Sequence, residues 1–130
     1  MPVDLKISIS ILFVILSSIA VDAAPSRIEN RCGWFNNPTP RNAWLNDKDG
    51  EWIIAIQGEY EANGNWNPSF DLDNERKFVR TGSSYGYGCI CMKVESDLPT
   101  KKIRKVSSIK IKNLSDCRKD KNLKEPKSAD

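Results

Sequence analysis

Four cysteines constrain the fold of this chain more than any other feature of its sequence. Cys89 and Cys91 lie two positions apart in a run of strand-forming residues, which predicts that both side chains project from one face of a β-strand. Such neighbours are poorly placed to bond to each other, so we expect each to pair with one of the remaining cysteines, Cys32 and Cys117. The sequence leaves open which partner belongs to which. Either arrangement ties both ends of a small domain to one strand.

A zinc site built from four thiolates is the alternative use of these cysteines. Such sites usually contain two close cysteine pairs, whereas this chain has one, with a single residue between its members. Two acidic stretches, residues 47–50 and 71–75, contain only fragments of a calcium-binding loop. The pattern therefore favours two disulfides, and we predict neither a metal site nor a cofactor.

The N-terminal residues predict export. Residues 7–20 are fourteen residues without a charge, fewer than the roughly twenty apolar residues that span a membrane. Lys6 precedes this run and a small-residue motif follows it at residues 21–23, as in a secretory signal peptide. We therefore predict a signal peptide over residues 1–23, with no stable membrane insertion after cleavage; an uncleaved anchor is the alternative. Export also suits disulfides, which persist in oxidising compartments.

Histidine is absent from all 130 residues. Its absence excludes catalysis by Ser-His-Asp or Cys-His groups and metal sites built on imidazole. An enzyme of this composition would need a pair of carboxylates, for which Glu59 and Glu61 are the candidates. A chain this short leaves little room for a substrate cleft, so we favour a protein that acts without catalysis.

Turn signals and alternating runs predict a mainly β fold. Asp49-Gly50 is a tight-turn signal that joins residues 43–45 to residues 51–58 as a hairpin. Further strands are predicted over residues 77–80, 89–95 and 102–112, the last with a bulge near residues 105–107. We expect a small antiparallel sheet or a partly closed barrel, braced by two disulfides. An OB-like or lysozyme-inhibitor-like barrel suits the length.

The expected domain boundaries follow from composition. We predict a polar lead over residues 24–31, one β-rich domain over residues 32–118, and a charged, disordered tail over residues 119–130. Within the domain, residues 36–40 read as a turn-rich loop and residues 115–118 as a short turn or helical cap. The glycine-rich residues 82–88 read either as a flexible binding loop or as a bulge beside the cysteine strand.

Several motifs resemble those of a family of small exported bacterial proteins of unknown function. They include Cys32-Gly33-Trp34-Phe35 with the following Asn-Pro-Thr-Pro, and the Tyr-Gly-Tyr-Gly-Cys-x-Cys run that begins at Tyr85. The resemblance extends over roughly residues 31–118 and includes Cys117-Arg118. It implies a location in the bacterial envelope or outside the cell, and it carries no established activity.

Aromatic side chains are the first candidate binding groups. All four tryptophans lie within 33 residues. Trp44 and Trp52 are expected in the core, whereas Trp34 and Trp66 lie beside turn residues and are equally consistent with core packing or with an exposed ring that contacts a ligand. Phe35, Tyr85 and Tyr87 complete the predicted aromatic binding residues.

Charge is distributed unevenly along the chain. Residues 47–75 contain eight acids and one base, whereas residues 101–112 contain six bases and no acid. Lys110 and Lys112 on the predicted last strand are candidate contacts for an acidic protein or an anionic glycan. Lysines that protect a strand edge against aggregation are the alternative explanation.

These observations predict a non-enzymatic, exported binding protein of the bacterial envelope, periplasmic or secreted. Its partner would be an envelope protein or a cell-wall glycan and not a nucleic acid, and an inhibitor or immunity-type protein is one specific form. Two alternatives remain: a peptidoglycan-binding module that uses Trp34 or Trp66, and a small hydrolase that uses Glu59 and Glu61.

Overall fold

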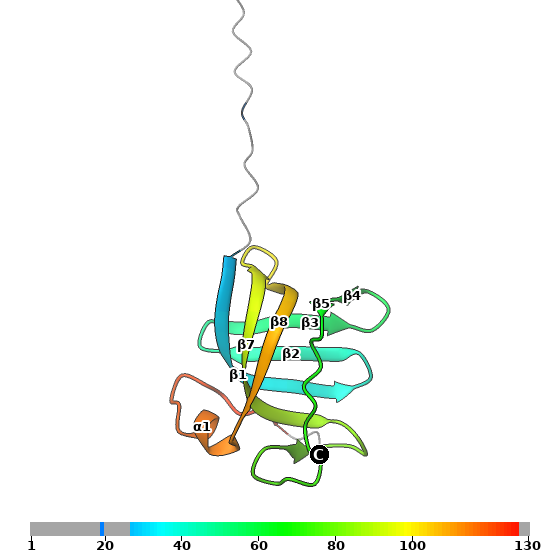
Figure 1. The fold of residues 1–130 in the computed structure, drawn as a ribbon, viewed down its shortest axis with the longest axis vertical. Coiled ribbons are helices and arrows are strands. Elements are labelled where there is room, and N and C mark those ends of the chain that lie inside the picture. The colour runs from blue at the N-terminus through cyan, green and yellow to red at the C-terminus, as the bar shows by residue number, and fades with distance from the viewer. Residues whose placement is uncertain (1–18, 20–26, 128–130) are drawn as a thin grey trace, which may run out of the picture.

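The computed structural model describes residue 19 and residues 27–127, and it shows a mainly β protein (Figure 1). The predicted signal peptide lies outside the described residues, apart from Ile19. The elements are listed in chain order: β1 (Arg27–Thr39), β2 (Asn42–Asp47), β3 (Gly50–Ile56), β4 (Tyr60–Glu61), β5 (Asn63–Gly64), β6 (Val79–Arg80), β7 (Gly86–Asp97), β8 (Lys102–Lys112) and α1 (Leu114–Arg118). In the described part of the chain, no helix is long and apolar enough to cross a membrane.

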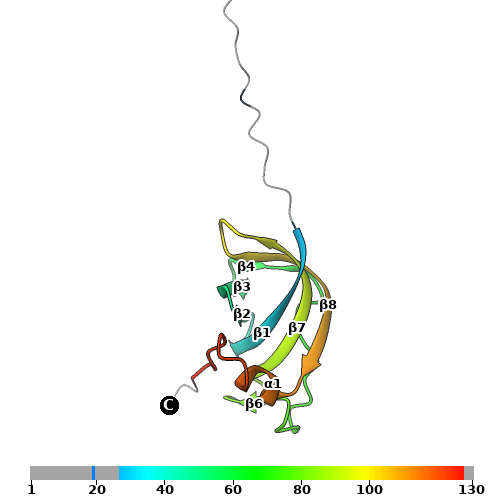
Figure 2. The ribbon, with the colours of Figure 1, turned by 90° about the vertical axis from the view of Figure 1, so that its left-hand side faces the viewer.

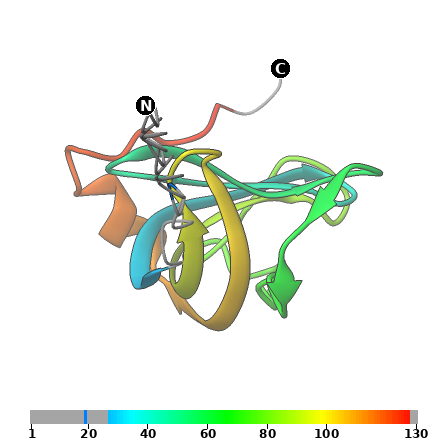
Figure 3. The same ribbon diagram turned by 90° about the horizontal axis from the view of Figure 1, so that it is seen from above.

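The strands form one sheet that curls into a partial ring. Its order is β4-β3-β2-β1-β7-β8-β5, and β3 also meets β8 in parallel where Ile53 lies opposite Lys102. The long strand β1 pairs with β7 through most of its length and with β2 near its end, so it passes from one layer to the other (Figure 2). Seen from above, the sheet closes partly on itself (Figure 3). The predicted fold class is therefore confirmed.

The inside of the ring is filled by the main apolar cluster. Alternate residues of β7, namely Ile90, Met92 and Val94, point inward and are almost fully buried. From the opposite layer, Leu45 and Ile54 reach the same cluster. The predicted hairpin of β2 and β3 is confirmed, with Asp47 opposite Gly50 at its turn. The predicted bulge is confirmed too, because the register against β7 skips Ser107.

The disulfides lie on the other face of β7. Cys32 bonds to Cys91 directly across the β1–β7 ladder, and Cys89 bonds to Cys117 in α1. The predicted pattern, in which each member of the close pair takes one distant cysteine, is confirmed, and the structure decides the order. The second bond holds α1 over a smaller cluster of buried side chains: Trp34, Tyr87, Cys89, Leu114 and Cys117.

Strand β1 is longer than the sequence predicted. It begins at Arg27, inside the expected polar lead, and continues to Thr39, inside the expected loop. Polar and proline-containing sequence is tolerated here because β7 and β2 supply hydrogen-bonding partners on the two sides of the strand. Residues 27–31, which the sequence assigned to the polar lead, are therefore part of β1 in the structure.

The prediction of a flexible loop in the glycine-rich segment is also corrected, because Gly86 and Gly88 belong to β7 and are buried. A Cβ on Gly86 would lie 1.9 Å from the carbonyl oxygen of Val79, and one on Gly88 would lie 2.4 Å from the Phe70 ring. These glycines therefore allow residues 70–79 to approach the strand closely, and the flexible-loop reading does not apply to them.

The segment after α1 differs from the predicted disordered tail. Leu123 packs against the smaller buried cluster, and Glu125 accepts a hydrogen bond from Arg118. These contacts give residues 119–127 a defined path over the domain, while residues 128–130 lie outside the described residues. The sequence could not predict this, because a single apolar residue and one pair of opposite charges do not distinguish a packed segment from a solvated tail.

The two disulfides are expected to have different structural consequences. Loss of either bond as a double cysteine-to-alanine variant should lower the free energy of unfolding by about 3–4 kcal/mol, because each closes a long loop of the unfolded chain. Only the Cys89→Ala, Cys117→Ala variant should also release α1 and expose Trp34, seen as red-shifted tryptophan emission. The Cys32→Ala, Cys91→Ala variant is the matched control, and equal emission from both variants would contradict this account.

Candidate binding surface

Three adjoining hollows share Asn67 as a lining residue, and together they make a recessed area of the surface around it. We call it the Asn67 recess and define it by the following residues: Asn37, Asn65, Trp66, Asn67, Phe70 and Tyr85. Its hollows have volumes of about 350, 300 and 470 Å³. Residues of the 65–70 segment line all three hollows, which extend from Asn37 of β1 to Ile109 and Ile111 of β8.

Two asparagines of the recess have unused hydrogen-bonding groups. Asn65 and Asn67 are exposed, and no hydrogen bond joins either side chain to another described residue. Asn37 differs, because its Nδ2 donates to the carbonyl oxygens of Thr39 and Asn42 at 2.8 and 2.7 Å. Asn37 therefore shapes the β1–β2 turn, whereas Asn65 and Asn67 are free to hydrogen-bond a ligand.

Tyr85 is the aromatic side chain that the structure leaves available in the recess. It is half-buried and lines two of the hollows. Phe35, one of the predicted binding residues, lies at the bottom of one hollow and is 1% exposed. Phe70 packs between Phe35 and Phe78, with ring centroids 6.1 and 5.0 Å away. The recess thus has an aromatic floor and a rim of amides.

The structure corrects the hypothesis that Trp34 or Trp66 presents an exposed ring. Trp34 is 0% exposed and packs edge-on against Tyr87 beneath α1, which also buries Tyr87. Trp66 is 8% exposed, and its Nε1 donates to Glu61 at 2.9 Å. Trp66 lines the recess but is almost fully covered, so neither ring is exposed enough for a sugar to stack on it.

Trp44 is the most exposed of the four tryptophans, contrary to its expected core position. It is half-buried, whereas Trp34, Trp52 and Trp66 are buried. The cause is strand alternation, because the neighbours Ala43 and Leu45 both point into the core and are 0% exposed. Trp44 must then face outward from β2.

The predicted carboxylate pair is not brought together in a cleft. Glu59 is exposed in the turn after β3, and Glu61 is exposed at the border of the recess beside Trp66. Among the described residues, no cluster of three cysteine, aspartate or glutamate side chains is arranged to hold a metal ion.

Lysines of β8 lie on the outward face of the sheet, next to the recess. Lys110 is exposed beside Cys91, and Lys112 is half-buried beside Cys89. Lys93 of β7 and Lys105 of β8 are exposed on the same side of the β7–β8 hairpin. No ion pair joins any of these four lysines to a residue within 27–127.

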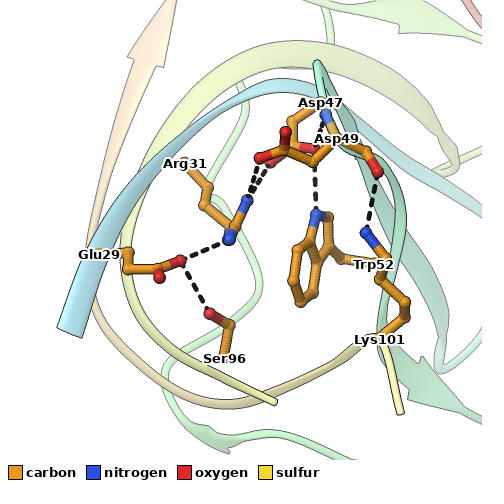
Figure 4. A network of polar contacts seen from close by, with 7 residues as sticks. All are labelled: Glu29, Arg31, Asp47, Asp49, Trp52, Ser96 and Lys101. Atoms are coloured by element: carbon orange, nitrogen blue, oxygen red, sulfur yellow. Dashed lines mark hydrogen bonds and ion pairs between the residues drawn. The ribbon is translucent and has the colours of Figure 1, made fainter. Parts of the chain in front are cut away.

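A partly buried network of charges, which the sequence did not predict, lies where β3 meets β8 (Figure 4). The Arg31 guanidinium donates to Asp47 at 2.9 Å and to Asp49 at 3.0 Å, and it also pairs with Glu29. Its central carbon lies 3.8 Å from the centre of the Trp52 ring, and Trp52 Nε1 donates to Asp47 at 3.0 Å. The sequence offered only two weak signals, acids spaced two apart and a basic residue two positions after Glu29.

Lys101 approaches the same tryptophan from the β7–β8 turn. Its Nζ lies 4.3 Å from the centre of the Trp52 ring and donates to the Asp49 carbonyl oxygen at 2.8 Å. Burial alone would lower the pKa of Arg31, but its hydrogen bonds to Asp47 and Asp49 outweigh burial and raise it. Arg31 therefore stays charged, and the network pins the β2–β3 turn to both neighbouring layers.

The Arg31 network is expected to be a large contributor to stability. Arg31→Met leaves the nearly buried Asp47 carboxylate without its cation, which should lower the free energy of unfolding in urea by about 3 kcal/mol. Arg80→Met is the matched control, because Arg80 pairs with the exposed Asp73 and should change stability by less than about 1 kcal/mol. Similar losses in the two variants would rule out a special role for this network.

Comparison with known proteins gives one match. A family model described as "Protein of unknown function (DUF4087)" matches residues 26–124. No match is found among the curated proteins, and none among the solved structures. The matched range includes every strand in the described part of the chain, together with α1 and most of the segment after it.

Proposed function

We propose that this chain, which belongs to the DUF4087 family of proteins of unknown function, is an exported binding protein of the bacterial envelope that acts by surface recognition. The observation that carries the proposal is the Asn67 recess. There, two exposed amides with no partner of their own flank an accessible tyrosine, on a sheet braced by two disulfides. A rigid site of this kind loses little conformational entropy when a partner binds.

Two observations support the proposed location. Two disulfides are consistent with an oxidising compartment. The apolar run near the N-terminus has the pattern of a secretory signal. Together they favour a periplasmic or secreted protein.

An envelope protein is the partner that we favour. The recess reaches Ile109 and Ile111 of β8, and Lys110 and Lys112 are their neighbours on the outward face, so a partner that covers this strand meets amide, apolar and cationic groups, a mixture that is typical of protein interfaces. An inhibitor or immunity-type protein that blocks an envelope hydrolase is one specific form of this proposal.

The test is capture of a partner that depends on the recess. Cross-linked pull-down with residues 24–130 from envelope extract, read by mass spectrometry, should enrich one protein. An Asn65→Ala, Asn67→Ala variant should lose most of that enrichment. The control is Asn30→Ala, Asn122→Ala, which removes two exposed asparagines outside the recess. No enriched partner, or equal capture by both variants, would refute the proposed role of the recess.

A cell-wall glycan is the second candidate ligand, and the accessible Tyr85 between free amides favours it. Peptidoglycan fragments bound in the recess should change the emission of Trp66, which lines it. Tyr85→Ala should abolish the change and Tyr85→Phe should keep most of it, because stacking needs the ring and not the hydroxyl. Unchanged wild-type emission at millimolar fragment would exclude the glycan.

A further inference from the structure

Strand β8 is paired along one edge and partly open along the other. β7 pairs with it over its whole length, whereas β3 meets the other edge only at Lys102, and β5 only at Lys105 and Val106. Within residues 27–127, nothing pairs with that edge between Ser107 and Lys112. The chain after β5 passes beside this part of β8 without joining the sheet (Figure 1).

The register of the sheet shows which backbone groups face the open edge. Cys32 and Cys91 oppose each other with their Cα atoms 4.0 Å apart, the close spacing of a non-hydrogen-bonded antiparallel pair. The N–H and C=O of Cys91 therefore point toward β8, where Cys91 pairs with Lys110. Since the two kinds of pair alternate, the N–H and C=O of Ile109 and Ile111 point away from β7. Four backbone groups thus face the open edge.

Space for an added segment lies beside these groups. A hollow of about 300 Å³ separates Ile109 and Ile111 from residues 65–69, and Asn65 and Asn67 line its far side. Exposed strand edges of this kind accept extended peptides through main-chain hydrogen bonds, while alternate side chains give specificity.

The side chains of β8 indicate the chemistry of the segment. Ile109 and Ile111 turn toward the main core cluster, whereas Lys110 and Lys112 turn to the outward face. A matching strand alternates apolar residues, which lie beside the isoleucines, with acidic residues, which lie beside the lysines. A second copy of β8 is a poor occupant, because its lysines would face these lysines.

We propose that the open edge of β8 at Ile109 and Ile111 receives an extended acidic segment of a protein partner, which adds to the sheet as a short further strand. This inference rests on the proposed function, because it specifies the segment that the partner protein presents. It also gives Lys110 and Lys112 a role in selecting the partner.

The probe is a capped peptide, Glu-Val-Glu-Val-Glu, titrated into isotope-labelled protein. The amide signals of Ile109 and Ile111 should shift together, and their hydrogen exchange should slow. Two further peptides carry N-methyl groups on the valines or on the glutamates. Only one set of peptide amides faces the edge, so one methylated peptide should bind about tenfold more weakly and the other should bind normally.

Charge reversal tests the choice of partner in the same titration. Lys110→Glu should weaken peptide binding about fivefold or more, and a Lys-Val-Lys-Val-Lys peptide should not bind to the wild type. The control is Lys48→Glu, which makes the same charge change in the β2–β3 turn and should leave binding unchanged. Equal binding by both variants would overturn the acidic specificity.

The outcomes separate this inference from the proposed function. If neither isoleucine amide responds to the peptide, or if both methylated peptides bind as tightly as the parent, strand addition at β8 is refuted. A captured envelope protein that depends on Asn65 and Asn67 would then still support the proposed function. Conversely, a peptide response without any captured partner would refute the proposed function and keep the open edge as a strand-binding site.

Discussion

The fold depends on the contact that closes the ring, where Trp52 lies between the cations of Arg31 and Lys101 (Figure 4). Lys101 acts there twice, because its carbonyl oxygen accepts the Ile53 N–H at 2.8 Å while its side chain covers the tryptophan. Its backbone adopts a positive φ of 56° at this point. One residue therefore joins the parallel strands β3 and β8 and covers the aromatic ring beneath them. Residues 60–64 add a second link between these layers, because β4 pairs with β3 and β5 pairs with β8.

Closure of the ring decides which side chains remain on the surface to bind a partner. Three of the four tryptophans are buried, either in the main cluster or under α1. The segment of residues 65–70 crosses from β5 toward β7. It brings Asn65 and Asn67 to the surface. The scaffold and the candidate binding groups are thus made by different parts of the chain. The aromatic floor at Phe70 links them, because it rests against Gly88 of β7.

Local sequence patterns predicted the strands and turns well. The features that they could not predict depend on pairing between residues far apart in the chain. The hairpin of β2 and β3, the bounds of β8 with its bulge, and the face shared by Cys89 and Cys91 all follow from alternation and turn residues. The cysteine order depends on the register of β1 against β7, which no local signal gives. The burial of Trp34 depends on α1 folding back over it, and the path of residues 119–127 depends on the packing of Leu123 and the contact between Arg118 and Glu125. Of the residues around the recess, Phe35, Trp66 and Tyr85 were candidate binding residues from the sequence, whereas its asparagines carry no distinctive spacing.

The arrangement of the two disulfides has a consequence for the order of events when the chain oxidises. Cys89 and Cys91 are chemically equivalent neighbours on one strand, so the thiol of Cys32 meets two candidates that differ only in their place along the β1–β7 ladder. The wrong choice would leave Cys117 facing Cys91 and would pull α1 away from Trp34. Correct pairing therefore requires the ladder to reach its register, either before the bond forms or by exchange from a wrong bond, and the disulfide then fixes the strand alignment that hydrogen bonds and core packing select.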